Sequence, residues 1–220
     1  MTAKTITVAQ HKGGAGKTTL SAQLAAAFDQ SGAKILLMDV DPQGSLSDWH
    51  AERVKTLGRK NNIMLVQTQG WKMTRDMSRF QKEFDYIFID TPPHAESESS
   101  IAIRSADLVL LPIQPSPLDI WACGPTIKIA LQEKRGLMLV MNRVPPKSNL
   151  NGKIMEKLAA MNIEVARQTL GNRVSYASSI MQGLGVVESD PRSTAADEIR
   201  ALVKEIKKSK VFKDLSSKAA

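Results

Sequence analysis

A glycine-rich segment near the amino terminus constrains the fold more than any other part of the chain. The run Thr5–Ala9 before it is rich in β-branched residues, as strands are, and a helix is predicted after it over Thr18–Gln30. Backbone N–H groups of such a turn, together with the positive end of the following helix, surround phosphate oxygens. The sequence therefore predicts a phosphate-binding loop made of Gly13, Gly14, Ala15, Gly16, Lys17, Thr18 and Thr19.

The rest of the chain alternates short apolar runs with longer helix-like stretches, which is typical of strands joined by crossover helices. We therefore expect the α/β class, with a doubly wound, mainly parallel sheet covered by helices on both faces. The predicted strands are Thr5–Ala9, Ile35–Asp39, Ile63–Val66, Tyr86–Asp90, Leu108–Ile113, Leu137–Asn142 and a weaker Glu164–Ala166. The predicted helices are Thr18–Gln30, Met73–Glu83, Leu118–Lys134 with a break at Pro125, Asn151–Met161, Tyr176–Met181 and Thr194–Lys208.

Composition excludes several classes of protein. The 220 residues are 42% hydrophobic and 24% charged, without a linker-like stretch, so a single domain over 1–220 is expected. The longest apolar runs are too short to cross a bilayer, and no signal-like segment follows Met1, so a cytoplasmic location is expected. The one cysteine, Cys123, cannot form an intrachain disulfide and cannot hold zinc or an iron–sulfur cluster alone.

The glycine-rich loop carries residues with defined chemistry. Lys17 is placed to reach the β- and γ-phosphates of a nucleotide, the Thr18 hydroxyl to ligate Mg²⁺, and Thr19 to bond near the α-phosphate. The spacing is irregular, because His11 stands where the usual motif has glycine, and Lys12 follows it. The sequence thus predicts a P-loop with an additional lysine.

Carboxylates end two of the predicted strands. Asp39 and Asp41 come at the end of the second strand, and Asp90 closes the fourth. Doubly wound sheets bind ligands at the carboxyl ends of their strands, so these acids are expected near the phosphates. A turn that merely ends the second strand before Pro42 is the alternative for the first two acids.

These motifs together resemble the ParA/MinD family of P-loop ATPases with a deviant Walker A sequence. The resemblance implies that Lys12 contacts phosphate across an ATP-sandwich dimer, although a solvated loop lysine is the alternative. It implies that Asp41 orients or activates the attacking water and that Asp39 holds the magnesium shell. Asp90 then corresponds to the Walker B acid, which accepts a hydrogen bond from magnesium-bound water.

The resemblance continues along almost the whole chain. The segment ending in Asp119 is similar to a family element after the fifth strand, where Asp119 either caps the next helix or lies at a dimer interface. Asn142 matches the family's adenine contact, with a turn residue as the alternative. The P-loop begins within the first dozen residues, which matches the short class that lacks a helix-turn-helix. Sequence-specific operator binding is therefore not expected.

Basic residues accumulate toward the carboxyl terminus of a chain with 30 Lys+Arg, 22 Asp+Glu and a formal net charge of +8. The helix Thr194–Lys208 is predicted to bury one apolar stripe and to carry its cations on another face, which suits non-specific contact with DNA phosphates. A solvated helix face is the alternative, and residues 206–220 are expected to form a basic, partly flexible tail. The predicted DNA contacts are Arg200, Lys204, Lys207 and Lys208, with Arg173 and Arg192 added from the resemblance.

The resemblance implies an Mg²⁺-dependent ATPase with Lys12, Lys17 and Asp41 as catalytic residues. It would form an ATP-dependent homodimer, bind nucleoid DNA non-specifically and position a plasmid, chromosome or other cargo. A ParB-like or cargo adaptor protein would stimulate its slow hydrolysis.

Two alternatives stay open. A MinD-like regulator would bind a membrane through the basic tail, whose apolar content is thin. A metabolic P-loop ligase would need a substrate pocket, and a reductase related to the nitrogenase iron protein would need cysteines that the chain lacks.

Overall fold

The computed structural model describes residues 2–93, 96–146, 154, 156, 158 and 163–212. Within them, seven parallel strands form one sheet in the order β3-β2-β4-β1-β5-β6-β7. This arrangement confirms the predicted mainly parallel sheet. The strands are β1 (Lys4–Val8), β2 (Ile35–Asp39), β3 (Ile63–Gln67), β4 (Tyr86–Asp90), β5 (Leu108–Ile113), β6 (Gly136–Met141) and β7 (Glu164–Val165).

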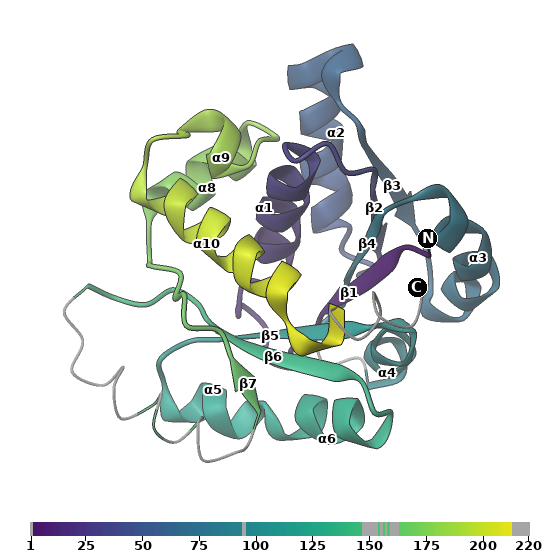
Figure 1. Cartoon of the computed structure of the whole chain (residues 1–220), viewed down its shortest axis with the longest axis vertical. Coiled ribbons are helices and arrows are strands. Elements are labelled where there is room, and N and C mark those ends of the chain that lie inside the picture. Colours follow the sequence, from purple (N-terminus) through teal and green to yellow (C-terminus); the bar gives the residue numbers. More distant parts are fainter. Residues whose placement is uncertain are drawn as a thin grey trace.

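Helices cover both faces of this sheet (Figure 1). One face is covered by α1 (Lys17–Asp29), α2 (Ser45–Leu57), α8 (Val174–Met181), α9 (Val186–Ser189) and α10 (Thr194–Lys208). The other face is covered by α3 (Gly70–Glu83), α4 (Glu96–Ser105), α5 (Pro117–Ala122) and α6 (Gly124–Gln132). A short 3₁₀ turn, Gly58–Lys60, follows α2.

The core explains why the strands are apolar along their whole length. Side chains of successive strand residues point to opposite faces, so a covered sheet buries all of them. In β2, Ile35 and Leu37 pack under α1, whereas Leu36 and Met38 pack under α3. The central strand β1 pairs with β4 on one side and β5 on the other, which places the loop after β1 at the middle of the sheet.

Most of the predicted elements are present, and three helices were not predicted. The break expected at Pro125 occurs between α5 and α6. The helices α2, α4 and α9 are additional. In α2 only Leu46, Trp49 and Arg53 are buried, so its sequence lacks the apolar periodicity that would have predicted a helix. The helix predicted over 151–161 falls largely outside the described residues.

The carboxyl-terminal segment packs on the core further than predicted. The side chains of Ile206, Ser209 and Phe212 are buried, and Lys4 Nζ lies 4.8 Å from the centroid of the Phe212 ring. Part of the tail predicted over 206–220 therefore packs on the core, and residues 213–220 lie outside the described part. None of the helices that the structure describes is both long and apolar enough to cross a membrane.

Candidate functional site

The loop between β1 and α1 has the backbone conformation that its glycines allow. Gly14 and Gly16 have φ angles of +75° and +88°, a region that other residues rarely adopt. A Cβ on Gly16 would lie 2.5 Å from Asn142 Nδ2, so a larger residue would also displace that side chain. Gly16 precedes the first turn of α1, which contains no acidic residue. The positive end of the helix is thus available to an anion.

Two side chains from other strands hold this loop in place. Asn142, after β6, donates from Nδ2 to the Ala15 carbonyl at 2.9 Å. Gln114, after β5, donates from Nε2 to the Gly14 carbonyl at 3.0 Å. Asn142 is thus part of the loop's support, and its predicted contact with adenine stays a prediction.

A cavity of about 330 Å³ gathers six of the predicted site residues, namely Gly14, Gly16, Lys17, Thr18, Thr19 and Asp41. Lys17 is almost fully buried. Burial lowers the pKa of its ammonium group, and the nearby charges of Asp90 and Asp41 partly oppose that shift. A cation held in this setting is a strong electrostatic partner for phosphate oxygens.

Asp90 lies at the end of β4, fully buried beside the first turn of α1. Thr18 Oγ1 donates to Asp90 Oδ2 at 2.7 Å, and Ser21 Oγ donates to Asp90 Oδ1 at 3.1 Å. Burial raises the pKa of Asp90 to about 7, and the charge of Asp39, its register partner in β2, adds to the effect. A hydroxyl and a carboxylate at one point are hard oxygen donors of the kind that Mg²⁺ prefers.

The described residues contain no cluster of three or more His, Cys, Asp or Glu side chains that suits a metal ion. A magnesium ion at this position would therefore depend on Thr18, Asp90 and the phosphates of a bound nucleotide. Magnesium sites commonly have this composition, because the ion retains water and substrate oxygens.

Asp39 organises the segment that carries Asp41. Its carboxylate accepts hydrogen bonds from Ser47 N at 2.9 Å, Ser47 Oγ at 2.7 Å and Asp41 N at 3.2 Å. Asp41 Oδ1 in turn accepts from Gln43 N at 2.9 Å, so the alternative interpretation as a turn holds in part. Burial raises the pKa of Asp39, whereas the bonds from Ser47 oppose the shift. The predicted role of Asp39 in a magnesium shell remains a prediction.

Lys12 does not line that cavity with Lys17. Its Nζ donates to Asp119 Oδ2 at 2.6 Å, and Asp119 is buried at the start of α5. The N-cap of α5 is Ser116, which accepts from Asp119 N and donates from Oγ to Asp119 Oδ2 at 2.9 Å. Asp119 thus supports the cap without being the cap itself, and it binds the additional lysine of the loop.

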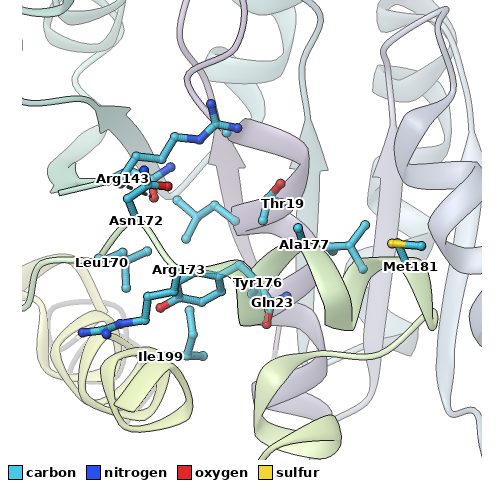
Figure 2. Close-up of a pocket in the computed structure, with 15 residues that line it drawn as sticks. Thr19, Gln23, Arg143, Leu170, Asn172, Arg173, Tyr176, Ala177, Met181 and Ile199 are labelled. Carbon is cyan, nitrogen blue, oxygen red and sulfur yellow. Dashed lines mark hydrogen bonds between the residues drawn. The ribbon is translucent and has the colours of Figure 1, made fainter. Parts of the chain in front are cut away.

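A second cavity, of about 410 Å³, opens beside the loop (Figure 2). Thr19 and Asn142, which the sequence predicts as nucleotide contacts, line it together with residues that were not predicted. The missed residues include Gln23, Arg143, Leu170, Asn172 and Tyr176. The only sequence signal for these residues is their position, either after strands β6 and β7 or along α1. Ligands bind at the carboxyl ends of parallel strands, and α1 begins at that edge of the sheet.

Arg173, predicted as a DNA contact, belongs to the wall of this second cavity. Its Nη2 donates to Glu198 Oε1 at 2.6 Å, and this bond raises the pKa of the guanidinium group. Tyr176 also donates to Glu198, and burial together with the Glu198 charge raises the pKa of its phenol. Arg173 is thus partly exposed and tied to α10, and its predicted contact with DNA stays a prediction.

The remaining predicted DNA contacts lie on or beside α10, whose apolar stripe is buried as predicted. Lys204, Lys208 and Arg192 are exposed. Arg200 pairs with Asp197 on the surface at 3.1 Å. Lys207 Nζ donates to Ser31 Oγ at 3.1 Å and lies 4.8 Å from the Phe28 ring centroid. Its ammonium group therefore already has partners within the protein.

Comparison with known proteins places this site in a family context. A model described as the CobQ/CobB/MinD/ParA nucleotide binding domain matches residues 6–213. The maintenance of carboxysome distribution protein A of Halothiobacillus neapolitanus is 28% identical over 209 residues, which cover 92% of this chain and 95% of that protein.

Two solved structures share the fold. The ATP complex of an McdA variant from Cyanothece has a TM-score of 0.75 and 22% identity, covering 92% of this chain and 95% of the other. A chain of the MinC:MinD cell division protein complex from Aquifex aeolicus has a TM-score of 0.80 and 20% identity, covering 94% of this chain and 97% of the other.

Proposed function

The chain belongs to the CobQ/CobB/MinD/ParA nucleotide-binding domain family, and on that premise we propose that it is a ParA-type ATPase that works on DNA as an ATP-dependent homodimer. The observation that carries this proposal is the placement of two lysines on one loop. Lys17 lines the cavity beside Thr18 and Asp41, whereas Lys12 lies outside that cavity and is 37% exposed. A lysine so placed can reach the phosphates of a second copy of the chain once it leaves Asp119.

In this proposal each of the two cavities binds one part of the nucleotide. The loop and Lys17 bind the phosphates, and the 410 Å³ cavity beside Thr19 and Asn142 takes the adenosine half of ATP. Thr18 and Asp90 would hold Mg²⁺, which would supply positive charge to offset the charge that develops on the phosphates. The backbone N–H of Asp41 is bonded to Asp39 and its carboxylate accepts from Gln43 N, and in this position the carboxylate orients the attacking water.

The exposed cations of α10 and Arg192 bind DNA through its phosphates, without reading its bases. Because only the ATP-bound dimer would present two such surfaces together, nucleotide state switches the protein between DNA-bound and free forms. A relative named for the maintenance of carboxysome distribution favours cargo positioning. In this proposal an adaptor protein, either ParB-like or bound to the cargo, stimulates hydrolysis. The working location is then the cytoplasm, on the nucleoid.

The MinD-like alternative is disfavoured by the position of Phe212. A membrane-binding tail needs apolar side chains that are free to enter lipid. Phe212 is the one aromatic residue of the predicted tail, and its ring is buried against Tyr86 at a centroid distance of 6.4 Å. Sedimentation with anionic liposomes tests this alternative directly, because binding that requires ATP would favour it over DNA binding.

Oligomeric state tests the proposal. The wild-type chain, measured by light scattering after gel filtration, should be a monomer without nucleotide and with ADP, and a dimer with ATP and Mg²⁺. The variant Lys17→Ala should stay monomeric because it loses ATP, whereas Lys34→Ala, away from the loop, should behave as the wild type. A wild-type chain that binds ATP and remains monomeric would contradict the proposal.

A further inference from the structure

Glu198 lies in α10, yet its carboxylate bonds to the wall of the nucleoside cavity. Oε1 accepts from Arg173 Nε at 3.1 Å and from Arg173 Nη2 at 2.6 Å. Oε2 accepts from Gly171 N at 3.1 Å and from the Tyr176 hydroxyl at 2.9 Å. The side chain is almost completely buried. A single carboxylate thus fixes a turn and the first helical residues after it.

All three partners of Glu198 line the cavity of about 410 Å³. In Figure 2 the side chains of Arg173 and Tyr176 lie next to each other, close to Ile199 of α10. The segment 171–176 is therefore one wall of the cavity, and α10 supports it from behind through Glu198. The opposite wall is formed by the start of α1, where Thr19 and Gln23 lie.

The charge of Glu198 matters to this arrangement. Burial alone would raise the pKa of its carboxyl group, but the bonds from Arg173, Gly171 N and Tyr176 outweigh burial and lower it. The group is therefore ionised at neutral pH, and its bonds are charge-assisted. Removing the carboxylate would leave the Arg173 guanidinium group and the Gly171 N–H without this acceptor. The Tyr176 hydroxyl would keep only the Ala195 carbonyl, at 3.3 Å, and the wall would rearrange.

We propose that Glu198 is a positioning residue for the nucleoside half of the ligand, because it holds Gly171, Arg173 and Tyr176 in the geometry against which base and ribose rest. This inference rests on the proposed function, in which the cavity takes adenosine. It deepens that function by separating two parts of the site. The phosphate half is built from Lys17, Thr18 and Asp90, and the bonds of Glu198 go to the other half.

This separation can be measured with two ligands. Calorimetric titration with ATP reports both halves of the site, whereas titration with inorganic tripolyphosphate reports the phosphate half alone. For Glu198→Gln we expect ATP to bind about tenfold more weakly, as losing one charge-assisted bond commonly costs about 1.4 kcal/mol. Tripolyphosphate should bind within about twofold of the wild type, since a factor of two is only about 0.4 kcal/mol.

Glu205→Gln is the matched control. Glu205 lies two turns further along the same helix and accepts from Arg167 N and Gln168 N, both at 2.8 Å, so it holds a neighbouring segment that does not line the cavity. This control should bind both ligands as the wild type does. Arg173→Gln removes the cation that faces Glu198, and it should reproduce the selective loss if Glu198→Gln proves too unstable to study.

Each result has a distinct meaning. Selective weakening of ATP supports the inference. Unchanged ATP affinity in Glu198→Gln, or equal weakening of both ligands, would overturn it, because the residue would then have no role in the site or only a general structural one. A wild-type chain that binds tripolyphosphate and not ATP would instead overturn the assignment of the cavity, and the proposed function with it.

Discussion

Lys12 of the phosphate-binding loop and Asp119 of α5 form an ion pair with an N–O distance of 2.6 Å. Asp119 is buried, and Lys12 is partly exposed. In the proposed dimer Lys12 reaches the phosphates of the other copy, so it must first leave Asp119. The pair therefore stabilises the arrangement of the single chain and opposes the dimer.

Asp119→Asn should strengthen ATP-dependent dimerisation. The substitution removes the charge that holds Lys12 and keeps an oxygen that can accept from Ser116. Because Lys12 is partly exposed, the gain is modest, about 0.5–1 kcal/mol for each chain. Both chains release their pair in the dimer, so its dissociation constant should fall roughly five- to thirtyfold. Sedimentation equilibrium with ATP measures it. Glu133→Gln, which breaks a surface pair with Arg104, is the control, and an unchanged or weaker dimer in Asp119→Asn would contradict the role given to the pair.

Asp41→Ala should keep ATP binding and dimerisation and lose turnover. Its carboxylate lines the cavity with Lys17, and general acid–base residues commonly contribute about a hundredfold or more to rate. Phosphate release under saturating ATP measures turnover, and calorimetry measures ATP affinity in the same preparation. Asp48→Asn, an exposed acid in the first turn of α2, should retain full activity. Normal turnover in Asp41→Ala would remove this residue from the mechanism.

The sequence predicted the sheet and the loop well because both depend on local patterns. The runs Ile35–Asp39, Tyr86–Asp90 and Leu108–Ile113 are buried almost throughout, so they are visible as continuous apolar stretches, and their observed bounds agree with the prediction. The glycines of the loop are visible for a similar reason, since the positive φ angles of Gly14 and Gly16 require that residue type.

Several contacts of the site and of the core join residues far apart in the sequence, and they were not predictable. Lys12 and Asp119 are 107 residues apart, and Arg53 and Glu188 are 135 apart. A charged residue such as Arg53 is expected at the surface, and only the fold shows that its side chain is fully buried. Glu198 likewise resembles any helix-surface acid until the position of Tyr176 is known.

Asp90 should make the stability of the ligand-free protein depend on pH. Its folded pKa is raised to about 7, above the value of about 3.9 in an unfolded chain, so the folded state keeps this proton after the unfolded state has lost it. Stability therefore falls as pH rises from about 4 to 7 and is level above that range.

Asp90→Asn removes this contribution. Its free energy of unfolding, relative to the wild type, should rise between pH 5 and pH 8 by roughly 1–3 kcal/mol. Urea denaturation without Mg²⁺ or nucleotide measures both proteins across this range. Asp76→Asn, whose acid is exposed, is the control for changes in overall charge. A difference between Asp90→Asn and the wild type that does not change with pH would show that Asp90 has an ordinary pKa in the folded protein.

Arg53→Ala should destabilise the fold strongly. The Arg53 guanidinium donates to Glu188 at 2.7 and 2.8 Å and to Asp29 at 3.2 Å, which joins α1, α2 and α9. Its removal leaves two largely buried carboxylates unpaired, at a cost of about 3–5 kcal/mol in the free energy of unfolding. Urea denaturation at neutral pH measures the loss.

Lys55→Ala, two residues further along α2, breaks an exposed pair with Glu52 and should cost less than about 1 kcal/mol. Similar small losses in Arg53→Ala and Lys55→Ala would contradict the structural role of the Arg53 cluster.

Binding to random-sequence duplex DNA, measured with ATP, with ADP and without nucleotide across a salt series, shows whether nucleotide controls DNA binding. We predict tight binding with ATP and Mg²⁺ only, weakening steeply as salt rises. The exposed pair Lys204 and Lys208 contributes phosphate contacts, so Lys204→Gln/Lys208→Gln should reduce the magnitude of the log–log salt slope by about two per chain. Equal affinity for DNA in all three nucleotide states, or no binding in any of them, would contradict an ATP-controlled DNA-binding switch.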